Sequence, residues 1–114
     1  MSELTFDDLR TTNVRRCEDA FQPLDTWSPT DWACAMAGEA GEACNVVKKL
    51  RRIDSSPQIA HAERALLLVH AADEIADTVI YLDLLAARLS IDLGAAVRRK
   101  FNATSMKVGS LVTL

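Results

Sequence analysis

Carboxylates interrupt the apolar stripe of a helix that we expect over residues 29–53. Along this stretch one helix face recurs at alternating intervals of three and four residues. Its members are Trp32, Met36, Glu39, Ala43, Val46, Leu50 and Ile53. Glu39 is the only charged member, and Glu42 lies three residues further along the same side of the helix. A carboxylate on a core-facing stripe is costly to desolvate unless a cation or several donors compensate for its charge.

A second helix, expected over residues 58–89, repeats this anomaly. One stripe consists of Leu67, His70, Glu74, Asp77, Tyr81 and Leu84. The neighbouring stripe is apolar throughout and consists of Leu68, Ile75, Leu82, Leu85 and Leu89. If the two helices pack antiparallel, their acid pairs face each other. Four unpaired carboxylates would repel one another, so an oxygen-ligated cation such as Mg²⁺ or Mn²⁺ is the simplest resolution.

Two other interpretations of these features remain open at this point. Two acids three residues apart are common on a solvated helix face, where they need no metal. Gly38 and Gly41 flank the first acid pair, although each glycine costs a helix about 1 kcal/mol relative to alanine. We expect the glycines either to leave room for a ligand beside Glu39 and Glu42 or to permit tight packing against another helix.

Capping and turn signals divide the chain into four helices, which predicts an all-α, four-helix bundle-like fold in a single domain over residues 1–114. Thr5 and Asp8 can form a capping box before a helix that reaches about Phe21. Ser28 and Pro29 begin the second helix. The last helix follows residues 90–92 and reaches about residue 106. Residues 1–26 supply the N-terminal helix and connection, and residues 109–114 a tail.

Charge and hydropathy exclude several classes of protein. The net charge of −3, from 13 basic and 16 acidic residues, provides no general basic field for duplex nucleic acid. The acidic N-terminus lacks the apolar run of a signal peptide, and acids break the apolar residues 65–89, so we expect no membrane segment. Cys17, Cys34 and Cys44 lack metal-site spacing. We expect packed, reduced thiols in a cytoplasmic protein.

The paired acid motifs resemble the signature of the MazG-like, all-α nucleoside triphosphate pyrophosphohydrolases, which include small dCTP and dUTP pyrophosphatases. The signature stands here as EAGE at residues 39–42 and DEIAD at residues 73–77. The flanking runs MAGEAGEACNVVKKLRR, DEIADTVIYLDLLAARLSIDL and RRKFNATS look like the second, third and last helices of that family. The resemblance therefore covers about residues 27–108.

This resemblance implies Mg²⁺-dependent cleavage between the α and β phosphates of a nucleoside triphosphate, in the cleaning of nucleotide pools. It also implies that Glu39, Glu42, Glu74 and Asp77 are metal ligands, with Glu39 and Glu42 catalytic. Many members carry a further Glu where this chain has Gly38. The number of metals and the identity of the general base therefore stay open.

Substrate contacts are expected from several further residues. Lys49 lies about 10 Å beyond Glu42 along the helix axis, within reach of the far end of a bound triphosphate. By resemblance, Lys100 and Asn102 match the last-helix pattern of the family and are expected to contact the phosphates, with Arg98 as the alternative to Lys100. A basic last helical turn that complements the helix dipole is the alternative for Lys49. Contacts to the base or sugar are expected from Trp27, Trp32 and Tyr81. Core packing competes with base stacking for Trp32, because it lies on the apolar stripe.

Assembly into a homodimer or homotetramer is expected, because the helix over residues 58–89 is apolar around nearly its whole circumference. The resemblance points the same way, to sites near subunit contacts in which Trp27, Lys100 or Asn102 could serve the neighbouring chain. Two alternatives to the leading function are kept. One is a non-catalytic helical protein that binds nucleotides or a partner, and the other is an enzyme like phosphoribosyl-ATP pyrophosphohydrolase.

Overall fold

The computed structural model describes residues 2–55 and 61–114, which contain helices and connections but no strand. The elements are α1 (Phe6–Arg16), the π-helical turn η1 (Cys17–Phe21), the 3₁₀ turn η2 (Leu24–Thr26), α2 (Pro29–Asp54), α3 (His61–Arg88) and α4 (Leu93–Val108). The prediction of four helices is confirmed. The expected start of the third helix near residue 58 lies outside the described residues.

Local capping explains where the helices begin and end. Thr5 and Asp8 form the expected capping box, in which the Thr5 hydroxyl accepts from the Asp8 N–H at 3.1 Å and the Asp8 carboxylate accepts from the Thr5 N–H at 3.1 Å. Ser28 begins α2 in the same way. Asp92 caps α4, and Gly109 ends it with a φ of 73°, a left-handed conformation that glycine adopts without strain.

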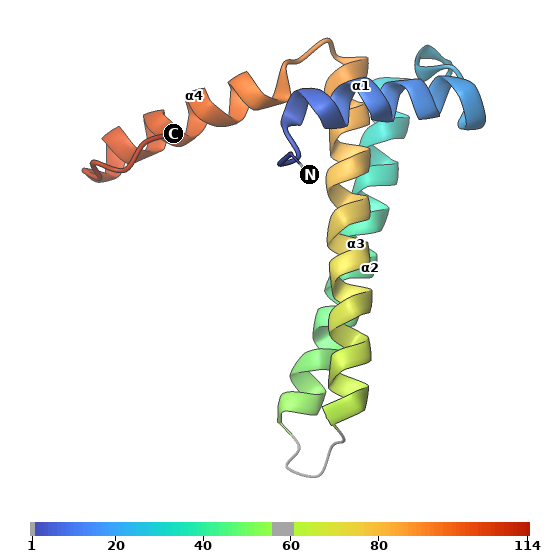
Figure 1. Ribbon diagram of the computed structural model, residues 1–114, viewed down its shortest axis with the longest axis vertical. Helices are drawn as coiled ribbons and strands as arrows, with labels where there is room; N and C mark the ends of the chain where they lie inside the picture. Colours follow the sequence, from blue (N-terminus) through green and yellow to red (C-terminus); the bar gives the residue numbers. More distant parts are fainter. Residues whose placement is uncertain (1, 56–60) are drawn as a thin grey trace.

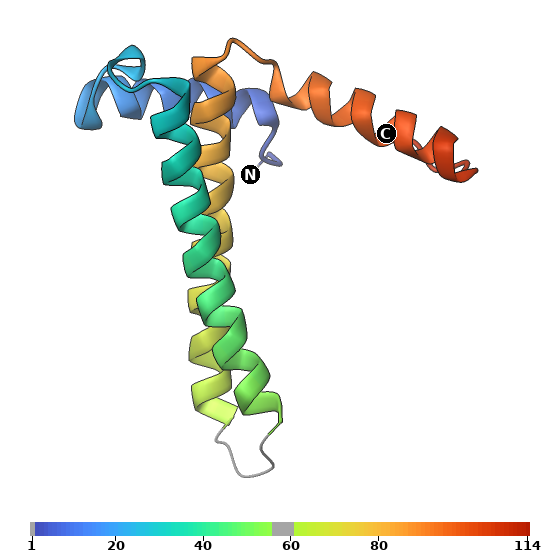
Figure 2. The same ribbon diagram turned by 180° about the vertical axis from the view of Figure 1, so that it is seen from behind.

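The helices form an open arrangement (Figures 1 and 2). The helices α2 and α3 make a long antiparallel hairpin, α1 crosses one end of it, and α4 projects away from that end. The radius of gyration is 17.4 Å, whereas a compact domain of this length would have about 13 Å. One chain therefore does not close the four helices into a compact bundle.

The core lies where α1 and η1 cross the hairpin. Cys17, Trp32 and Leu84 are buried there, and partly buried residues pack around them: Leu24, Trp27, Tyr81 and Leu85. The α2 stripe that includes Glu39 faces α3, and each of its members is buried or half-buried. The all-apolar stripe of α3 is different, because Leu68, Ile75, Leu82 and Leu89 are exposed. Leu85 is the member of that stripe that packs against the core, and the other four stay exposed in the single chain.

A buried polar network fixes the crossing of α1 and α3. Asp83, with no exposed surface, pairs with Arg10 through an Nε–Oδ1 distance of 2.9 Å. Asn13 donates from Nδ2 to the Ile80 carbonyl at 2.9 Å and to Asp83 Oδ2 at 3.1 Å. Arg10 Nη2 also donates to the carbonyl of Ile91 at 2.9 Å, which ties the turn before α4 to α1. The network joins three segments that are distant in sequence.

The arm formed by α4 and the tail has its own contacts. Gly94 permits a close approach to α1, because a Cβ there would lie 3.3 Å from Phe6 Cβ. The tail folds back on α4, since Leu114 N donates to Asn102 Oδ1 at 2.8 Å and Asn102 Nδ2 donates to the Leu114 carbonyl at 3.2 Å.

The structure bears on two expectations from the sequence, that the cysteines are packed and reduced and that no segment crosses a membrane. The three cysteines are free, as expected, but the prediction that all are packed is wrong: Cys17 is buried, whereas Cys34 and Cys44 are exposed on α2. None of the described helices combines the length and apolarity needed to cross a membrane.

Candidate functional site

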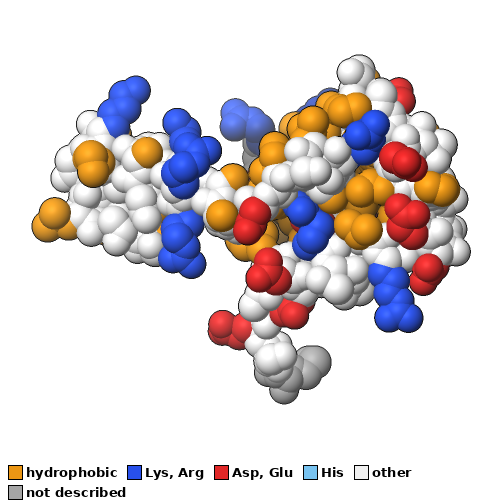
Figure 3. Space-filling view, turned by 90° about the horizontal axis from the view of Figure 1, so that it is seen from above, with side chains coloured by type: hydrophobic (Ala, Val, Ile, Leu, Met, Phe, Trp, Pro, Cys, Tyr) orange, Lys and Arg blue, Asp and Glu red, His pale blue; other side chains and the backbone are white. Residues whose placement is uncertain are grey.

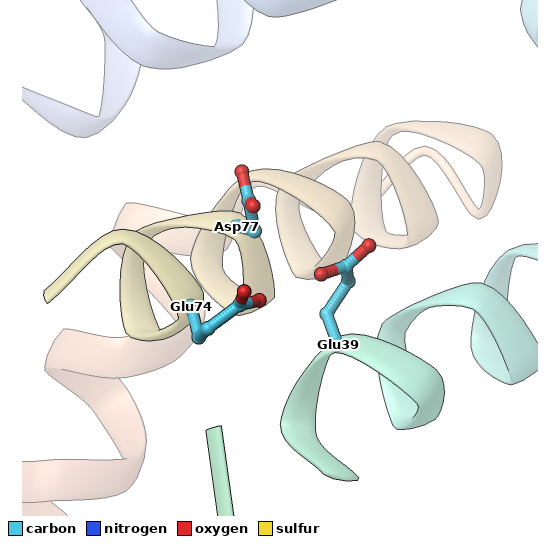
Figure 4. Close-up of side chains that lie close together, drawn as sticks. All are labelled: Glu39, Glu74 and Asp77. Carbon is cyan, nitrogen blue, oxygen red and sulfur yellow. The ribbon is translucent and has the colours of Figure 1, made fainter. Parts of the chain in front are cut away.

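Three carboxylates converge between α2 and α3 (Figure 4). Glu39 comes from α2, and Glu74 and Asp77 come from α3. One oxygen from each lies within 4.8 Å of the other two. The spacing of three residues places Glu74 and Asp77 on one side of α3, and the antiparallel hairpin brings Glu39 opposite them. Of the four acids predicted to hold a metal, the structure brings these three together, and Glu42 is not among them. That they bind a metal stays a prediction.

Burial and mutual repulsion make the acidic cluster (Glu39, Glu42, Glu74 and Asp77) electrostatically unfavourable on its own. Burial raises the pKa of Glu39, and the charges of Glu42 and Asp77 raise it further. Burial also raises the pKa of Glu74, followed by a hydrogen bond and charge repulsion from Glu42. Glu42 is exposed on α2 but lies near enough to affect both neighbours. The protein alone does not compensate for these charges.

A cation would satisfy atoms that the protein leaves without partners. Glu74 Oε2 is buried and has no hydrogen-bond partner among the described residues, and such an atom normally signals a missing ligand, ion or water. The ion pairs found in residues 2–55 and 61–114 lie elsewhere, at Asp83, Asp19 and Asp54. Carboxylate oxygens are the ligands that Mg²⁺ prefers in proteins. The donor set therefore fits a hard divalent cation.

Open space surrounds the glycines beside these acids. A Cβ built on Gly38 or Gly41 would meet no atom within 4 Å. Tight packing within the chain therefore does not explain either glycine. The space beside Glu39 and Glu42 is available to a ligand or to another molecule.

A cavity of about 380 Å³ adjoins the acidic cluster. Glu39 and Asp77 line it from the hairpin, and Tyr81 follows Asp77 along α3. The opposite wall comes from α1 and η1 and includes Asn13, Arg16, Cys17 and Phe21. Its volume is within the range of small-molecule sites. A ligand bound here would meet the carboxylates of Glu39 and Asp77 and the aromatic rings of Phe21 and Tyr81.

Comparisons of the chain with protein-family models, with curated proteins and with solved structures find no match. The chemistry of the cavity and the acids carries the functional argument. Among the predicted contacts to a base, only Tyr81 lines the cavity. It was chosen from its position on the α3 stripe, one turn beyond Asp77.

The two tryptophans form part of the core, which corrects the expectation that Trp32 stacks on a base. Trp32 has no exposed surface, and its Nε1 donates to the Leu24 carbonyl at 3.0 Å. Both ring faces are therefore occupied by protein. Trp27 is half-buried, with its ring centroid 4.7 Å from that of Trp32 and 5.4 Å from that of Phe21. Neither tryptophan lines the cavity beside the acids.

The predicted phosphate contacts are not brought to the acids within one chain. Lys49 is exposed, ten residues after Glu39 on α2, which is about 15 Å along the helix. Lys100 is exposed on α4, which projects away from the hairpin. Asn102 hydrogen-bonds the backbone of Leu114, so its amide is already paired. The roles of these three residues stay predictions.

Asn13, Arg16 and Phe21 line the cavity, although the sequence analysis gave none of them a site role. A signal for Asn13 exists, because it lies four residues after Leu9 and four before Cys17, which share the inward stripe of α1. A polar residue on that stripe is the same anomaly that revealed Glu39 and Glu74. Arg16 is exposed, and its position on α1 carries no comparable signal.

Proposed function

We propose that this protein is a Mg²⁺-dependent, MazG-like nucleoside triphosphate pyrophosphohydrolase that removes unwanted nucleotides from the cell's pool. The observation that carries the proposal is the convergence of Glu39, Glu74 and Asp77 beside a cavity. Glu39 and Asp77 line this cavity together with the aromatic rings of Phe21 and Tyr81. A nucleoside triphosphate has matching parts, since its phosphates bind a metal ion and its base is planar. The resemblance of the acid motifs selects hydrolysis between the α and β phosphates.

The acids have distinct tasks in this proposal. Glu39, Glu74 and Asp77 would hold the ion, and their oxygens leave other positions to water and phosphate. A bound Mg²⁺ supplies charge neutralisation of the phosphates and a lowered pKa for a coordinated water. Glu42 is exposed and is not one of the three acids whose oxygens converge. Its carboxylate would accept the proton of the attacking water. Tyr81 and Phe21 would contact the base and exclude water from it.

The test of this function is a panel of nucleoside triphosphates incubated with the full chain and Mg²⁺. We expect a nucleoside monophosphate and pyrophosphate in equal amounts, because the cleaved bond joins the α and β phosphates. Release of a diphosphate and orthophosphate would contradict this assignment. Binding without any turnover would instead favour a non-catalytic nucleotide-binding protein. Turnover of phosphoribosyl-ATP alone would favour the other enzymatic alternative.

A homo-oligomer is part of this proposal, and the open fold is its main support. Six large apolar residues of α3 are exposed, as is Leu89 directly after it: Leu66, Leu68, Val69, Ile75, Val79 and Leu82. The described part of α4 carries four basic residues, Arg98, Arg99, Lys100 and Lys107, and no acid. Figure 3 shows Lys and Arg side chains along this arm. A basic arm from a second copy would complement the acidic cluster, and it would bring Lys100 toward the phosphates.

We expect light scattering to give the mass of a dimer or tetramer at micromolar concentration. The reason is that contiguous apolar surface on α3 is unfavourable in water and matches itself across a two-fold axis. Ile75→Glu, which places a charge on that surface, should shift the protein toward the monomer. Glu63→Lys, at an exposed position on the same helix, reverses a charge outside the apolar stripe and serves as the control. A fully active wild-type monomer would contradict both the assembly and the shared site.

A further inference from the structure

The orientation of the Asn13 amide is fixed by the residues around it. Asn13 is only 4% exposed. Its Nδ2 donates to the carbonyl of Ile80 at 2.9 Å and to Asp83 Oδ2 at 3.1 Å. A backbone carbonyl can only accept, and the other oxygen of Asp83 is held by Arg10 at 2.9 Å. Rotating the amide by 180° would set Oδ1 against two acceptors, so only one orientation is stable.

This orientation leaves Oδ1 as the polar atom that Asn13 can offer to the cavity. Oδ1 accepts no hydrogen bond from any residue in the described ranges 2–55 and 61–114. Asn13 lines the cavity that Glu39 and Asp77 also line. In the described residues the fully buried side-chain atoms without a partner are Gln22 Nε2 and Glu74 Oε2, so Asn13 Oδ1 keeps surface that is accessible from the cavity. A ligand that displaces water from Oδ1 must supply an N–H group in its place, or it loses affinity.

The cavity wall contains donors in the Arg16 guanidinium and the Tyr81 hydroxyl, but neither donates to Asn13 Oδ1 within the described residues. The thiol of Cys17, one turn after Asn13, donates to the Gln22 carbonyl at 3.2 Å and is thereby committed. Ile80 and Leu84 present apolar surface, and Phe21 presents an aromatic ring. A flat ring that enters between these side chains would therefore meet Asn13 Oδ1 as a fixed acceptor.

We propose that Asn13 reads the exocyclic group of the nucleobase and selects amino bases over oxo bases. Adenine and cytosine carry an exocyclic N–H₂ donor, whereas guanine and thymine carry an oxygen at the corresponding position. An amino group would donate to Asn13 Oδ1, whereas an oxo group would place two acceptors in contact. The inference rests on the proposed function for its ligand, a nucleotide with its phosphates at the acids. It adds the identity of the base.

Two substrate pairs test this inference in the wild-type full chain. The members of each pair, dCTP with dUTP and dATP with dITP, differ in an amino or oxo group on the ring and in the protonation of the adjacent nitrogen. We expect kcat/KM to favour the amino member of at least one pair by about 10- to 100-fold. The amino base gains a hydrogen bond to Asn13 Oδ1, whereas the oxo base leaves that acceptor unpaired. Equal values within both pairs, or a preference for the oxo members, would overturn the inference.

Variants and a binding measurement separate this inference from the proposed reaction. Asn13→Ala should bring the amino-to-oxo ratio close to one, a change that a loss of stability alone would not produce. Thr12→Ala, an exposed neighbour on α1, should keep the ratio of the wild type. Calorimetric binding of dCMP and dUMP with Mg²⁺ reports base selection without turnover. Preferential binding of dCMP without hydrolysis of any triphosphate would support base selection and refute the reaction, and equal binding would refute base selection.

Discussion

Glu74→Gln is expected to lower kcat/KM for pyrophosphate release by at least about 100-fold. Mutating a residue that only orients a metal ligand costs about 10- to 100-fold, and removing the ligand itself should cost no less. Glu74 combines a buried oxygen, unpartnered among the described residues, with a place in the cluster beside Glu39 and Asp77. The amide keeps its shape but removes the charge. Glu39→Gln, Glu42→Gln and Asp77→Asn should have effects of the same kind. The measurement is steady-state kinetics at saturating Mg²⁺.

Asp73→Asn is the matched control, because Asp73 precedes Glu74 on α3 but is exposed and outside the acidic cluster. It should keep the activity of the wild type. Thermal melts check the fold: Mg²⁺ should stabilise the wild type and have little effect on Glu74→Gln. Without metal the variant should be at least as stable as the wild type, since one repelling charge is gone. Full activity of Glu74→Gln would remove Glu74 from the site.

Arg10→Leu is expected to lower the free energy of unfolding by about 3–5 kcal/mol, the range measured when one partner of a buried ion pair is removed. The Asp83 side chain is only 1% exposed, and Arg10 Nε is its cationic partner at 2.9 Å. Leucine would leave a buried carboxylate with only the Asn13 amide. Chemical denaturation, followed by the loss of helical signal in circular dichroism, gives the free energy of unfolding.

Two further variants make this second prediction specific. Arg15→Leu removes an arginine of the same helix whose partner, Asp19, lies 3.7 Å away with both side chains exposed. It should change stability by less than about 1 kcal/mol. Adding Asp83→Asn to Arg10→Leu should recover part of the loss, because no buried charge is left unpaired. A small effect of Arg10→Leu, similar to that of Arg15→Leu, would show that the pair does not hold α1 on the hairpin.

The sequence predicts what depends on neighbours along the chain. The starts of three helices follow from Thr5, Ser28 and Asp92. Each of these side chains accepts a hydrogen bond from the backbone N–H three residues later. The facing of Glu39 and Glu74 followed from helix periodicity and one antiparallel hairpin. Each step needs only local geometry and a single short connection. For that reason the candidate metal site was accessible before any coordinates were known.

Contacts between distant segments were beyond such reasoning. Arg10 and Asp83 are 73 positions apart, and no periodicity links a charge on one helix to a charge on another. The direction of α4 depends on the turn at residues 89–92 and on Gly94, so its departure from the hairpin was not foreseen. The burial of Trp32 likewise depends on where η1 and η2 pass over α2. All of these features depend on packing between segments that are distant in the sequence, and local sequence patterns do not predict such packing.

The antiparallel hairpin also restricts how the length of this protein can change during evolution. One residue inserted into α2 after Glu39 turns the helix by about 100° and advances it by about 1.5 Å, which moves all following residues off the face toward α3. Seven residues restore nearly the original angle. We therefore expect relatives with a longer hairpin to have gained whole heptads in α2 and α3 together, at the end far from α1. Such changes preserve the meeting of Glu39 with Glu74, and single insertions would be eliminated.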